Sequence, residues 1–444
     1  MKKTKVLCTI GTASMDTDLI KKMFDAGMNG VRINTAYGNI DQYKRVIDNV
    51  RSVADIPILI DIKGPEVRIK SKKTKKVFPG EIIAVGFDEN QEVSFTHDFF
   101  EKIDVGDVIN IDNNKIHTRV TEKKQGILNL QVLSDGVIAD GKGVNIPNKN
   151  LMIPTLSAKD IEIVDFSIQQ GVEYIALSFT RNAQDIDNLR NQAKGFKGGI
   201  IAKIEDTEGV EKIDEILEAA DGIMVARGDL GIEIAPERVP LVQKSIILRC
   251  NQRAKIVITA TEMLESMLHN PLPTRAEVSD VANAILDGTD VVMLSGETAI
   301  GHYPVEAVNM MSSIAMVTED AVISRVESIE GSFFNISDAV SKAIQRLCQN
   351  MPIDKVVTLT RSGYTAKVIA RFRIKQPIIA VTPDKRVKTQ LELLYGVYPV
   401  QIDYQTEKDL IRTVANNLSS LNLVNKDEVV LFTAGVRTQQ KHAS

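Results

Sequence analysis

The chain contains 444 residues, of which 43% are apolar and 25% are charged, and its net charge at pH 7 is -4. This balance excludes a strongly basic nucleic-acid-binding protein and a disordered acidic chain, and the length is enough for about three domains. No segment approaches the ~18 apolar residues of a membrane span, and the apolar run near the amino terminus is too short for a signal peptide. Three separated cysteines, Cys8, Cys250 and Cys348, lie in apolar segments. We therefore expect a soluble, cytoplasmic protein with reduced thiols and no nucleic-acid or membrane partner.

Eight short apolar runs, most of them followed by an amphipathic segment, predict strands that alternate with helices. The runs are Lys5–Gly11, Gly30–Thr35, Pro57–Lys63, Tyr174–Phe179, Gly199–Glu205, Gly222–Ala226, Lys255–Met263 and Asp290–Glu297. Such alternation implies parallel βαβ units, and eight of them imply an α/β fold, a (βα)₈ TIM barrel built from residues 1–67 and 154–332. Reactive side chains in this barrel lie at the carboxyl ends of the strands. The polar residues at those ends are Arg32, Asn34, Asp61, Lys63, Ser178, Lys203, Glu205, Asp229, Thr261 and Glu297.

Residues 68–153 have a different sequence pattern, in which short β-rich runs are broken by the turn sequences PGE, VGD, DNN and DGKG. They predict a small β-barrel inserted between the third and fourth strands of the larger barrel. An insert on the active face can act as a lid that excludes water. We expect lid contacts at Asp112 and at the neck Lys142–Asn145. The alternative is that the insert is a passive decoration.

Residues 333–444 alternate again between helical and strand patterns, which predicts an open α/β sandwich. The strands are Lys355–Leu359, Pro377–Val381, Tyr398–Ile402 and Glu428–Thr433, and the helices are Ile336–Gln349, Tyr364–Phe372, Arg386–Tyr395 and Glu407–Leu421. The first strand is followed by Thr360, Arg361, Ser362, Gly363, Tyr364 and Thr365. Hydroxyls, a glycine and an arginine at a helix start form a natural anion site. The alternative is a plain capped helix start.

The fifth and sixth barrel strands carry the most informative charges. Alternation places Lys203 and Glu205 on one face of a strand. The next strand runs into Arg227, Gly228 and Asp229, where the glycine lets the backbone approach a ligand. Two carboxylates and one ammonium suit a magnesium-bound anionic substrate. The alternative is a structural ion pair with Asp229 capping the following turn.

Several long strings in the chain are similar to those of the pyruvate kinase family, and the resemblance covers nearly the whole chain. The strings are DIKGPEVR (61–68), IIAKIEDTEGV (200–210), DGIMVARGDLGIEI (221–234), ITATEMLESM (258–267) and PTRAEVSDVANAILDGTDVVMLSGETA (273–299). The resemblance implies magnesium-dependent phosphoryl transfer from phosphoenolpyruvate to ADP, followed by protonation of the enolate, which gives pyruvate and ATP. It also suggests a homotetramer.

The family pattern implies a role for each matching residue. Glu205 and Asp229 ligate Mg²⁺ or Mn²⁺, and Lys203 neutralises charge on the transferring phosphoryl group and the enolate oxygen. The backbone of Ala226, Arg227, Gly228 and Asp229 holds the substrate carboxylate together with the Thr261 hydroxyl. Thr261 also lies on the proton-delivery route and would relay a proton through water; the alternative is a hydroxyl bonded to backbone. Arg32 and Arg68 resemble phosphate clamps, and Glu297 lies near the metal by analogy.

The expected potassium and nucleotide sites depart from the family pattern. The chain reads NTAYG at 34–38, where potassium-dependent members usually read NFSHG. Ala36 therefore removes a serine oxygen, and Tyr37 replaces a histidine near the nucleotide. Glu66 is nevertheless the residue type of potassium-dependent members. The oxygen ligands that remain are Asn34, Asp61 and the backbone carbonyl of Ile62, so we expect a retained but weakened potassium site.

Two further departures concern regulation. The lid reads IDNNK at 111–115, which keeps Asp112 and loses an acidic neighbour. The chain ends AGVRTQQKHAS, without the glycine-rich loop that completes the family's sugar-phosphate effector site. We therefore expect no strong activation by fructose-1,6-bisphosphate, although another phosphorylated effector remains an option. The rival interpretations are a magnesium-dependent aldolase or lyase on the same barrel and a catalytically silent metabolite sensor; the sensor would have lost Lys203, Glu205 or Asp229, and none is lost.

Overall fold

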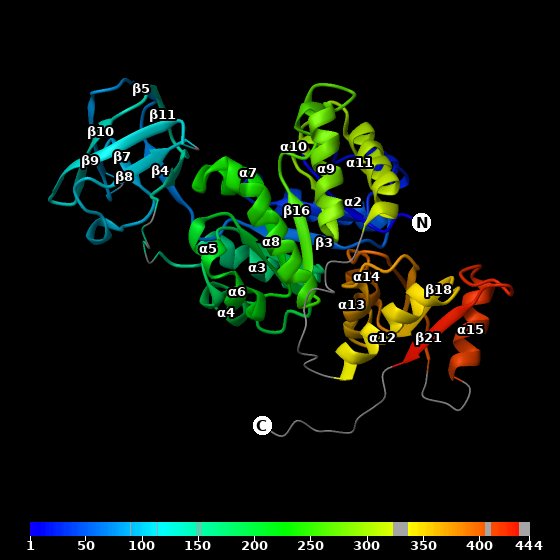
Figure 1. Ribbon diagram of the computed structural model, residues 1–444. Coiled ribbons are helices and arrows are strands. Elements are labelled where there is room, and N and C mark those ends of the chain that lie inside the picture. Colours follow the sequence, from blue (N-terminus) through cyan, green and yellow to red (C-terminus); the bar gives the residue numbers. More distant parts are fainter. Residues whose placement is uncertain are drawn as a thin grey trace.

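Three units follow one another in space in the computed structural model (Figure 1), with the cyan insert at one end, the barrel in the middle and the yellow-to-red carboxyl-terminal unit at the other end. The structure describes residues 1–88, 90–112, 114–147, 149, 151, 153–322, 336–404 and 410–434. Three expectations lie outside these residues: the start of the last helix at Glu407, the boundary between residues 332 and 333, and the carboxyl-terminal sequence beyond Ala434. Asn113 of the lid also lies outside them.

The central unit is a closed barrel of eight parallel strands in the order β1-β17-β16-β15-β14-β13-β3-β2. The strands are β1 (Lys5–Thr9), β2 (Gly30–Asn34), β3 (Ile58–Ile62), β13 (Tyr174–Leu177), β14 (Gly199–Ile204), β15 (Gly222–Ala226), β16 (Ile256–Ala260) and β17 (Val291–Leu294). Nearly every strand residue is buried, because one face fills the barrel and the other packs against helices. This double burial explains why the strands read as continuous apolar runs. The predicted TIM barrel is confirmed.

Helices surround this barrel, and some of them begin and end at capping residues. They are α1 (Thr17–Asp25), α2 (Ile40–Val53), α3 (Ala158–Gln170), α4 (Ala183–Gln192), α5 (Thr207–Glu211), α6 (Ile213–Ala219), α7 (Arg227–Glu233), α8 (Val239–Gln252), α9 (Arg275–Asp287), α10 (Gly296–Ala299) and α11 (Pro304–Thr318). Thr274 forms a capping box at the start of α9, and Gly288 ends the helix in a left-handed conformation. The segment Arg227–Glu233 is helical and follows β15 directly. No helix in the described part of the chain is long and apolar enough to cross a membrane.

The insert closes into a second, smaller barrel in the order β10-β6-β7-β4-β12-β8-β9, as predicted. Its strands are β4 (Val67–Ser71), β6 (Ile82–Gly86), β7 (Val93–Phe95), β8 (Val108–Ile111), β9 (Ile116–Lys124), β10 (Ile127–Val132) and β12 (Gly143–Asn145), and β5 (Lys75–Val77) pairs with β11 (Gly136–Ile138). The insert has its own apolar core, in which Phe87, Phe95 and Phe99 lie with ring centroids 4.9 to 5.2 Å apart. The insert is therefore a separately packed unit.

Gly64, between β3 and the insert, is required by the fold. Its φ is +63°, and an added Cβ would lie 2.2 Å from the carbonyl oxygen of Ser178. We expect Gly64→Ala to lower the free energy of unfolding by more than the ~1 kcal/mol that a disfavoured φ alone costs. Gly126→Ala is the matched control, because Gly126 has φ +73° and open space around it. Equal losses in urea-induced unfolding of the two variants would show that the contact with Ser178 does not matter.

The carboxyl-terminal unit is a four-stranded parallel sheet in the order β20-β19-β18-β21. Its strands are β18 (Lys355–Leu359), β19 (Ile378–Thr382), β20 (Val397–Gln401) and β21 (Val430–Ala434), and its helices are α12 (Ile336–Asn350), α13 (Tyr364–Ala370), α14 (Lys385–Leu391) and α15 (Leu410–Ser420). This unit covers the amino-terminal end of the barrel. The Lys5 ammonium in β1 donates to the Val397 carbonyl at 2.7 Å, and Arg373 pairs with Asp290 at 3.0 Å. The opposite, carboxyl-terminal end of the barrel faces the insert.

Candidate active site

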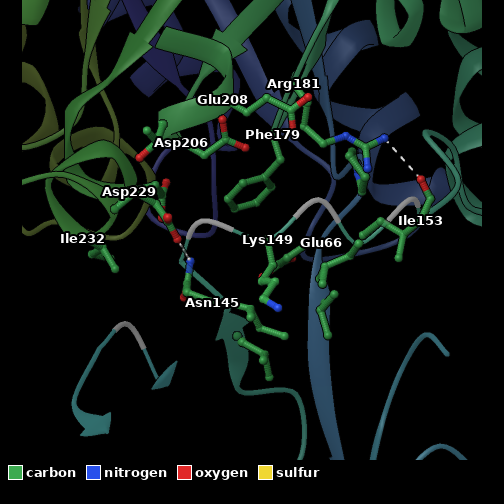
Figure 2. A pocket seen from close by; sticks show the side chains of 18 of the residues that line it. Glu66, Asn145, Lys149, Ile153, Phe179, Arg181, Asp206, Glu208, Asp229 and Ile232 are labelled. Carbon is green, nitrogen blue, oxygen red and sulfur yellow. Dashed lines mark hydrogen bonds between the residues drawn. The ribbon is translucent and has the colours of Figure 1, made fainter. Parts of the chain in front are cut away.

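A cavity of about 490 Å³ lies between the insert and the carboxyl ends of the barrel strands. Figure 2 shows the barrel residues Asp206, Glu208 and Asp229 on one side of it and the insert residues Asn145 and Lys149 on the other. Its lining is mixed polar and apolar, and among the charged residues carboxylates outnumber cations. A partly open, charged cavity therefore lies beside the strand ends that the sequence analysis identified.

Five side chains from neighbouring strand ends form one buried network next to this cavity. Lys203 places its Nζ 2.6 Å from Ser178 Oγ, 3.2 Å from Asp61 Oδ2 and 3.0 Å from Glu205 Oε1. Arg32 donates to Asp61 Oδ2 through Nε at 2.8 Å and pairs with it through a second nitrogen at 2.7 Å. Each of the five residues is at most 8% exposed. Two cations facing two carboxylates offset much of the desolvation cost of burying four charges.

Burial and pairing shift the pKa values in this network. Burial opposes the charged form of Lys203, but the Asp61 and Glu205 carboxylates outweigh it and raise the pKa of the ammonium above its usual value. Burial raises the pKa of Glu205 to about 7, against the attraction of Lys203 and with the help of the nearby Asp229 charge. Asp61 has a lowered pKa, because Lys203 and Arg32 together overcome its burial. Lys203 is thus a permanent cation, whereas Glu205 carries a weakly held charge.

Glu205 and Asp229 are two carboxylates of the kind that could hold a divalent cation. Glu205 keeps one oxygen on Lys203 and accepts the Phe179 N–H at 2.6 Å with the other. Asp229 is half-buried in the first turn of α7 and lines the cavity. Among the residues that the structure describes, no group of three or more histidines, cysteines or carboxylates is arranged around one point. Mg²⁺ commonly takes one or two protein carboxylates and completes its shell with water and substrate oxygens, so this pair fits it.

Thr261 lies in a strained turn directly after β16. Its φ is 67° and that of Glu262 is 52°, and a β-branched residue in this region costs about 1–3 kcal/mol. The Thr261 hydroxyl accepts the Gly228 N–H at 2.7 Å and lies 2.6 Å from the Ala260 carbonyl, to which it donates. The hydroxyl therefore has backbone partners, as in the alternative interpretation, but one of them belongs to the segment expected to hold the substrate.

The side chains of Arg227 and Glu297 bind other parts of the protein, although the sequence places both residues near the substrate and the metal. The Arg227 backbone lies in the substrate segment, but its buried side chain donates to the Thr261 and Glu262 carbonyls and to Asp280. Glu297 is fully buried, and its carboxylate accepts the N–H groups of Leu264 and Ser295. Its oxygens thus hold the backbone of two loops, so these hydrogen bonds account for the buried carboxylate and a metal is not needed to explain it.

The expected potassium ligands lie together but already have protein partners. The Asn34 side-chain oxygen accepts the Ala36 N–H at 3.1 Å. The Ile62 carbonyl accepts the Ser178 N–H at 3.1 Å, and the Asp61 carboxylate belongs to the buried network. Tyr37 is 77% exposed and adds no side-chain oxygen to this group.

Arg68 lies at the neck of the insert, on β4. It donates to Glu66 at 2.8 Å and to the Gly141 carbonyl at 2.6 Å, and its side chain is 31% exposed. Lys63, another strand-end residue, pairs with Glu66 at 3.6 Å. Glu66 thus pairs with two cations at the neck, and Arg68 remains partly exposed beside the cavity-lining Glu66.

Two hydrogen bonds close the insert onto α7. Asn145 Nδ2 donates to Glu233 Oε1 and Asn114 Nδ2 donates to the Ile232 carbonyl, each at 2.5 Å. The neck was expected to make such contacts, whereas Asp112 pairs with Lys142 inside the insert at 2.9 Å. Asn114 and Glu233 were missed, because nothing in the DNN turn or in the end of α7 distinguishes them from surface residues.

The anion loop of the carboxyl-terminal unit adopts the expected turn. Gly363 has φ 81° and precedes α13, and its N–H donates to Thr360 Oγ1 at 3.0 Å. Arg361, Ser362 and Tyr364 are exposed, and Thr365 is partly buried. Because Gly363 occupies the capping position and no side chain caps α13, the alternative of a plain Ser- or Thr-capped helix start is not supported, and the anion site stays a prediction.

Comparisons with known proteins agree with this geometry. The family models "Pyruvate kinase, barrel domain" and "Pyruvate kinase, alpha/beta domain" match residues 1–308 and 338–444. Pyruvate kinases of Sporosarcina psychrophila and Geobacillus stearothermophilus are each 42% identical over 98% of this chain, which covers 78% of each of them. A crystal structure of a pyruvate kinase from Cryptosporidium parvum superposes with a TM-score of 0.92 at 31% identity, covering 98% of this chain and 94% of that one. These relatives favour a phosphotransferase over the silent sensor and over the aldolase. The chain belongs to the pyruvate kinase family.

Proposed function

We propose that this chain transfers a phosphoryl group from phosphoenolpyruvate to ADP with Mg²⁺ or Mn²⁺, and protonates the resulting enolate to pyruvate. The observation that carries the proposal is the Lys203 ammonium, buried between Asp61 and Glu205 at 3.2 and 3.0 Å and next to the carboxylate pair that fits a divalent cation. Such a site stabilises charge that develops on a phosphoryl group and an enolate oxygen.

Glu205 and Asp229 would hold the divalent cation, which when bound would polarise the phosphoryl and enolate oxygens. Lys203 then places its fixed positive charge where negative charge accumulates. Because the ammonium is already held by three protein partners, it needs little reorganisation during the reaction. The insert, hydrogen-bonded to α7, excludes water that would compete for the phosphoryl group.

Substrate and product are held by groups around the same space. The backbone of Ala226 to Asp229 and the Thr261 hydroxyl would bind the carboxylate. The Gly228 N–H, which donates to that hydroxyl at 2.7 Å, shows that the two lie side by side, and substrate would replace this bond. Thr261 would pass a proton to the enolate through water, because a hydroxyl is too weak an acid to deliver it alone. Arg32 and Arg68 would bind phosphate oxygens. Asn34, at the end of β2, and Tyr37, in the loop that follows, would contact the nucleotide.

The direct test is formation of pyruvate from phosphoenolpyruvate and ADP in the presence of Mg²⁺. We expect pyruvate only when both substrates and the divalent cation are present, and loss of the product on addition of excess EDTA. Folded protein that forms no pyruvate with any divalent cation would overturn the proposal.

Potassium would bind weakly at Asn34, Asp61 and the Ile62 carbonyl, since each of these oxygens already has a partner. We expect potassium to raise the rate of pyruvate formation above that in a tetramethylammonium buffer. We also expect Ala36→Ser, which restores an oxygen, to lower the potassium concentration needed for half of that effect. Full activity without potassium and sodium would contradict a retained site.

An effector site at Thr360–Thr365 remains a proposal for a phosphorylated ligand, supported by the exposed Arg361 and Ser362 beside the left-handed Gly363. We expect fructose-1,6-bisphosphate to leave the KM for phosphoenolpyruvate unchanged within error. A large fall in that KM, measured over a titration of the sugar phosphate, would show that the site is complete.

The division of the chain and its assembly also stand as proposals. We propose a barrel of residues 1–67 and 154–332, a lid of residues 68–153 and a regulatory or oligomerisation unit of residues 333–444, in a cytoplasmic homotetramer. An exposed apolar stripe on α12 supports a subunit interface; its members are Ile336, Val340 and Leu347, and the exposed Met351 directly follows the helix. Light scattering coupled to gel filtration measures the assembly.

A further inference from the structure

The buried guanidinium of Arg227 joins three elements that meet behind the active site. It donates to the Thr261 carbonyl at 2.7 and 3.2 Å and to the Glu262 carbonyl at 2.9 Å. Through its other terminal nitrogen it forms two short hydrogen bonds to Asp280 on α9, at 2.8 and 2.6 Å. The side chain is only 9% exposed. One cation thus connects α7, the turn after β16, and α9.

The turn that Arg227 binds is the strained one. Thr261 and Glu262 are consecutive non-glycine residues with positive φ, and such a pair persists only where surrounding contacts determine it. Arg227 binds the carbonyl oxygens of both residues, so it fixes the two peptide planes that this conformation orients. On the far side of the turn, Glu297 accepts the Leu264 N–H at 3.0 Å.

The same turn sets the direction of the Thr261 hydroxyl. That hydroxyl meets the Gly228 N–H at 2.7 Å, and Gly228 follows Arg227 directly in the chain. The segment therefore contacts the turn twice, through a backbone N–H at the active-site surface and through a side chain beneath it. A relaxed turn would move the hydroxyl away from this N–H.

We propose that Arg227 is a positioning residue, whose guanidinium holds the Thr261–Glu262 turn so that the Thr261 hydroxyl faces the reacting substrate, and that Asp280 holds Arg227 in place. This inference rests on the proposed role of Thr261. The side chain and the backbone of Arg227 then have different roles: the side chain positions the turn, and the backbone binds the substrate. A fork of nitrogens is needed, because a lysine ammonium cannot bind two carbonyls and a carboxylate in these directions.

The test is a double-mutant cycle of Arg227→Met with Thr261→Ala, measured as kcat and KM for pyruvate formation. We expect Arg227→Met to lower kcat on the order of 10- to 100-fold, since a small misplacement of a reacting group has effects of this size. We expect Thr261→Ala to cost far less in the Arg227→Met background than in the unaltered protein, because the hydroxyl is already misplaced there. Arg249→Met is the control, as it removes another arginine–aspartate contact, to Asp214, on the outside of the barrel.

Additive losses in the cycle would overturn the positioning role while leaving the kinase proposal intact, and so would a Thr261→Ala variant of full activity. Absence of pyruvate from the unaltered protein would instead overturn the proposed function. If Arg227→Met does not fold, the same cycle is run with Arg227→Lys and with Asp280→Asn. We expect Arg227→Lys to show a partial loss of kcat that is non-additive with Thr261→Ala, and additivity in both of these cycles would overturn the inference.

Discussion

Replacing Lys203 by methionine is expected to lower kcat for pyruvate formation by about 10²- to 10³-fold, the usual loss when one preorganised stabiliser of developing charge is removed. Methionine keeps much of the apolar stem and removes the ammonium that lies within 3.2 Å of Ser178, Asp61 and Glu205. The KM for phosphoenolpyruvate should change less than kcat, because the ammonium acts chiefly on charge that appears in the transition state.

The Lys203→Met result is interpretable only if the protein remains folded and binds its cation. A shift of the thermal unfolding midpoint on addition of Mg²⁺ would demonstrate both. Lys212→Met is the matched control, since Lys212 lines the same cavity and pairs with Glu208, away from the network. Near-normal turnover in Lys203→Met would refute the role assigned to Lys203.

Glu205→Gln is expected to weaken Mg²⁺ binding by at least about 100-fold, the upper end of what loss of a supporting residue costs a metal site. The amide keeps the size of the side chain and the hydrogen bond from Phe179, but it removes the charge that the cation needs. The concentration of Mg²⁺ that gives half-maximal activity, and the shift of the unfolding midpoint with Mg²⁺, both measure this loss. Glu208→Gln, on the cavity wall, is expected to change neither by more than a small factor.

In the unaltered protein, the pH dependence of stability and of Mg²⁺ binding should follow the titration of Glu205. Its pKa is raised from 4.5 to about 7, so its contribution to stability is full below about pH 4.5 and is lost as the pH rises through 7. A divalent cation has to displace this proton below pH 7. We therefore expect the half-saturating Mg²⁺ concentration to rise about tenfold per pH unit below 7 and to level off above it. In Glu205→Gln this dependence should disappear, and its persistence there would assign the titration to another group.

The sequence predicted much of the fold because the barrel strands are buried on both faces and read as uninterrupted apolar runs. The eight runs, the insert and the carboxyl-terminal sheet all follow from this pattern and from the turn residues between them. Alternation also predicted that Lys203 and Glu205 would meet, because residues two apart on a strand share a face. These relations are local, so one sequence suffices to see them.

The remaining features depend on contacts between distant segments. Nothing in the string DGIMVARGDLG indicates that Arg227 turns its side chain toward Asp280 on α9. Asp61 was assigned to potassium by resemblance, whereas its carboxylate lies between Arg32 and Lys203. The contact of Asn114 with α7 spans 118 residues and depends on how the insert sits on the barrel. Side-chain direction and the docking of units are set by tertiary packing, which period and propensity do not encode.

The carboxyl-terminal unit covers the amino-terminal end of the barrel, and this arrangement has a consequence for biosynthesis. One apolar cluster contains Leu7 and Met224 from barrel strands together with Ile369 and Leu391 from the carboxyl-terminal unit. The hydrogen bond from Lys5 to Val397 joins residues 392 positions apart. A chain emerging from the ribosome therefore leaves the amino-terminal end of the barrel uncovered until the residues up to Val397 have been translated. The exposed apolar surface of that late intermediate is where chaperone binding and aggregation would compete with folding.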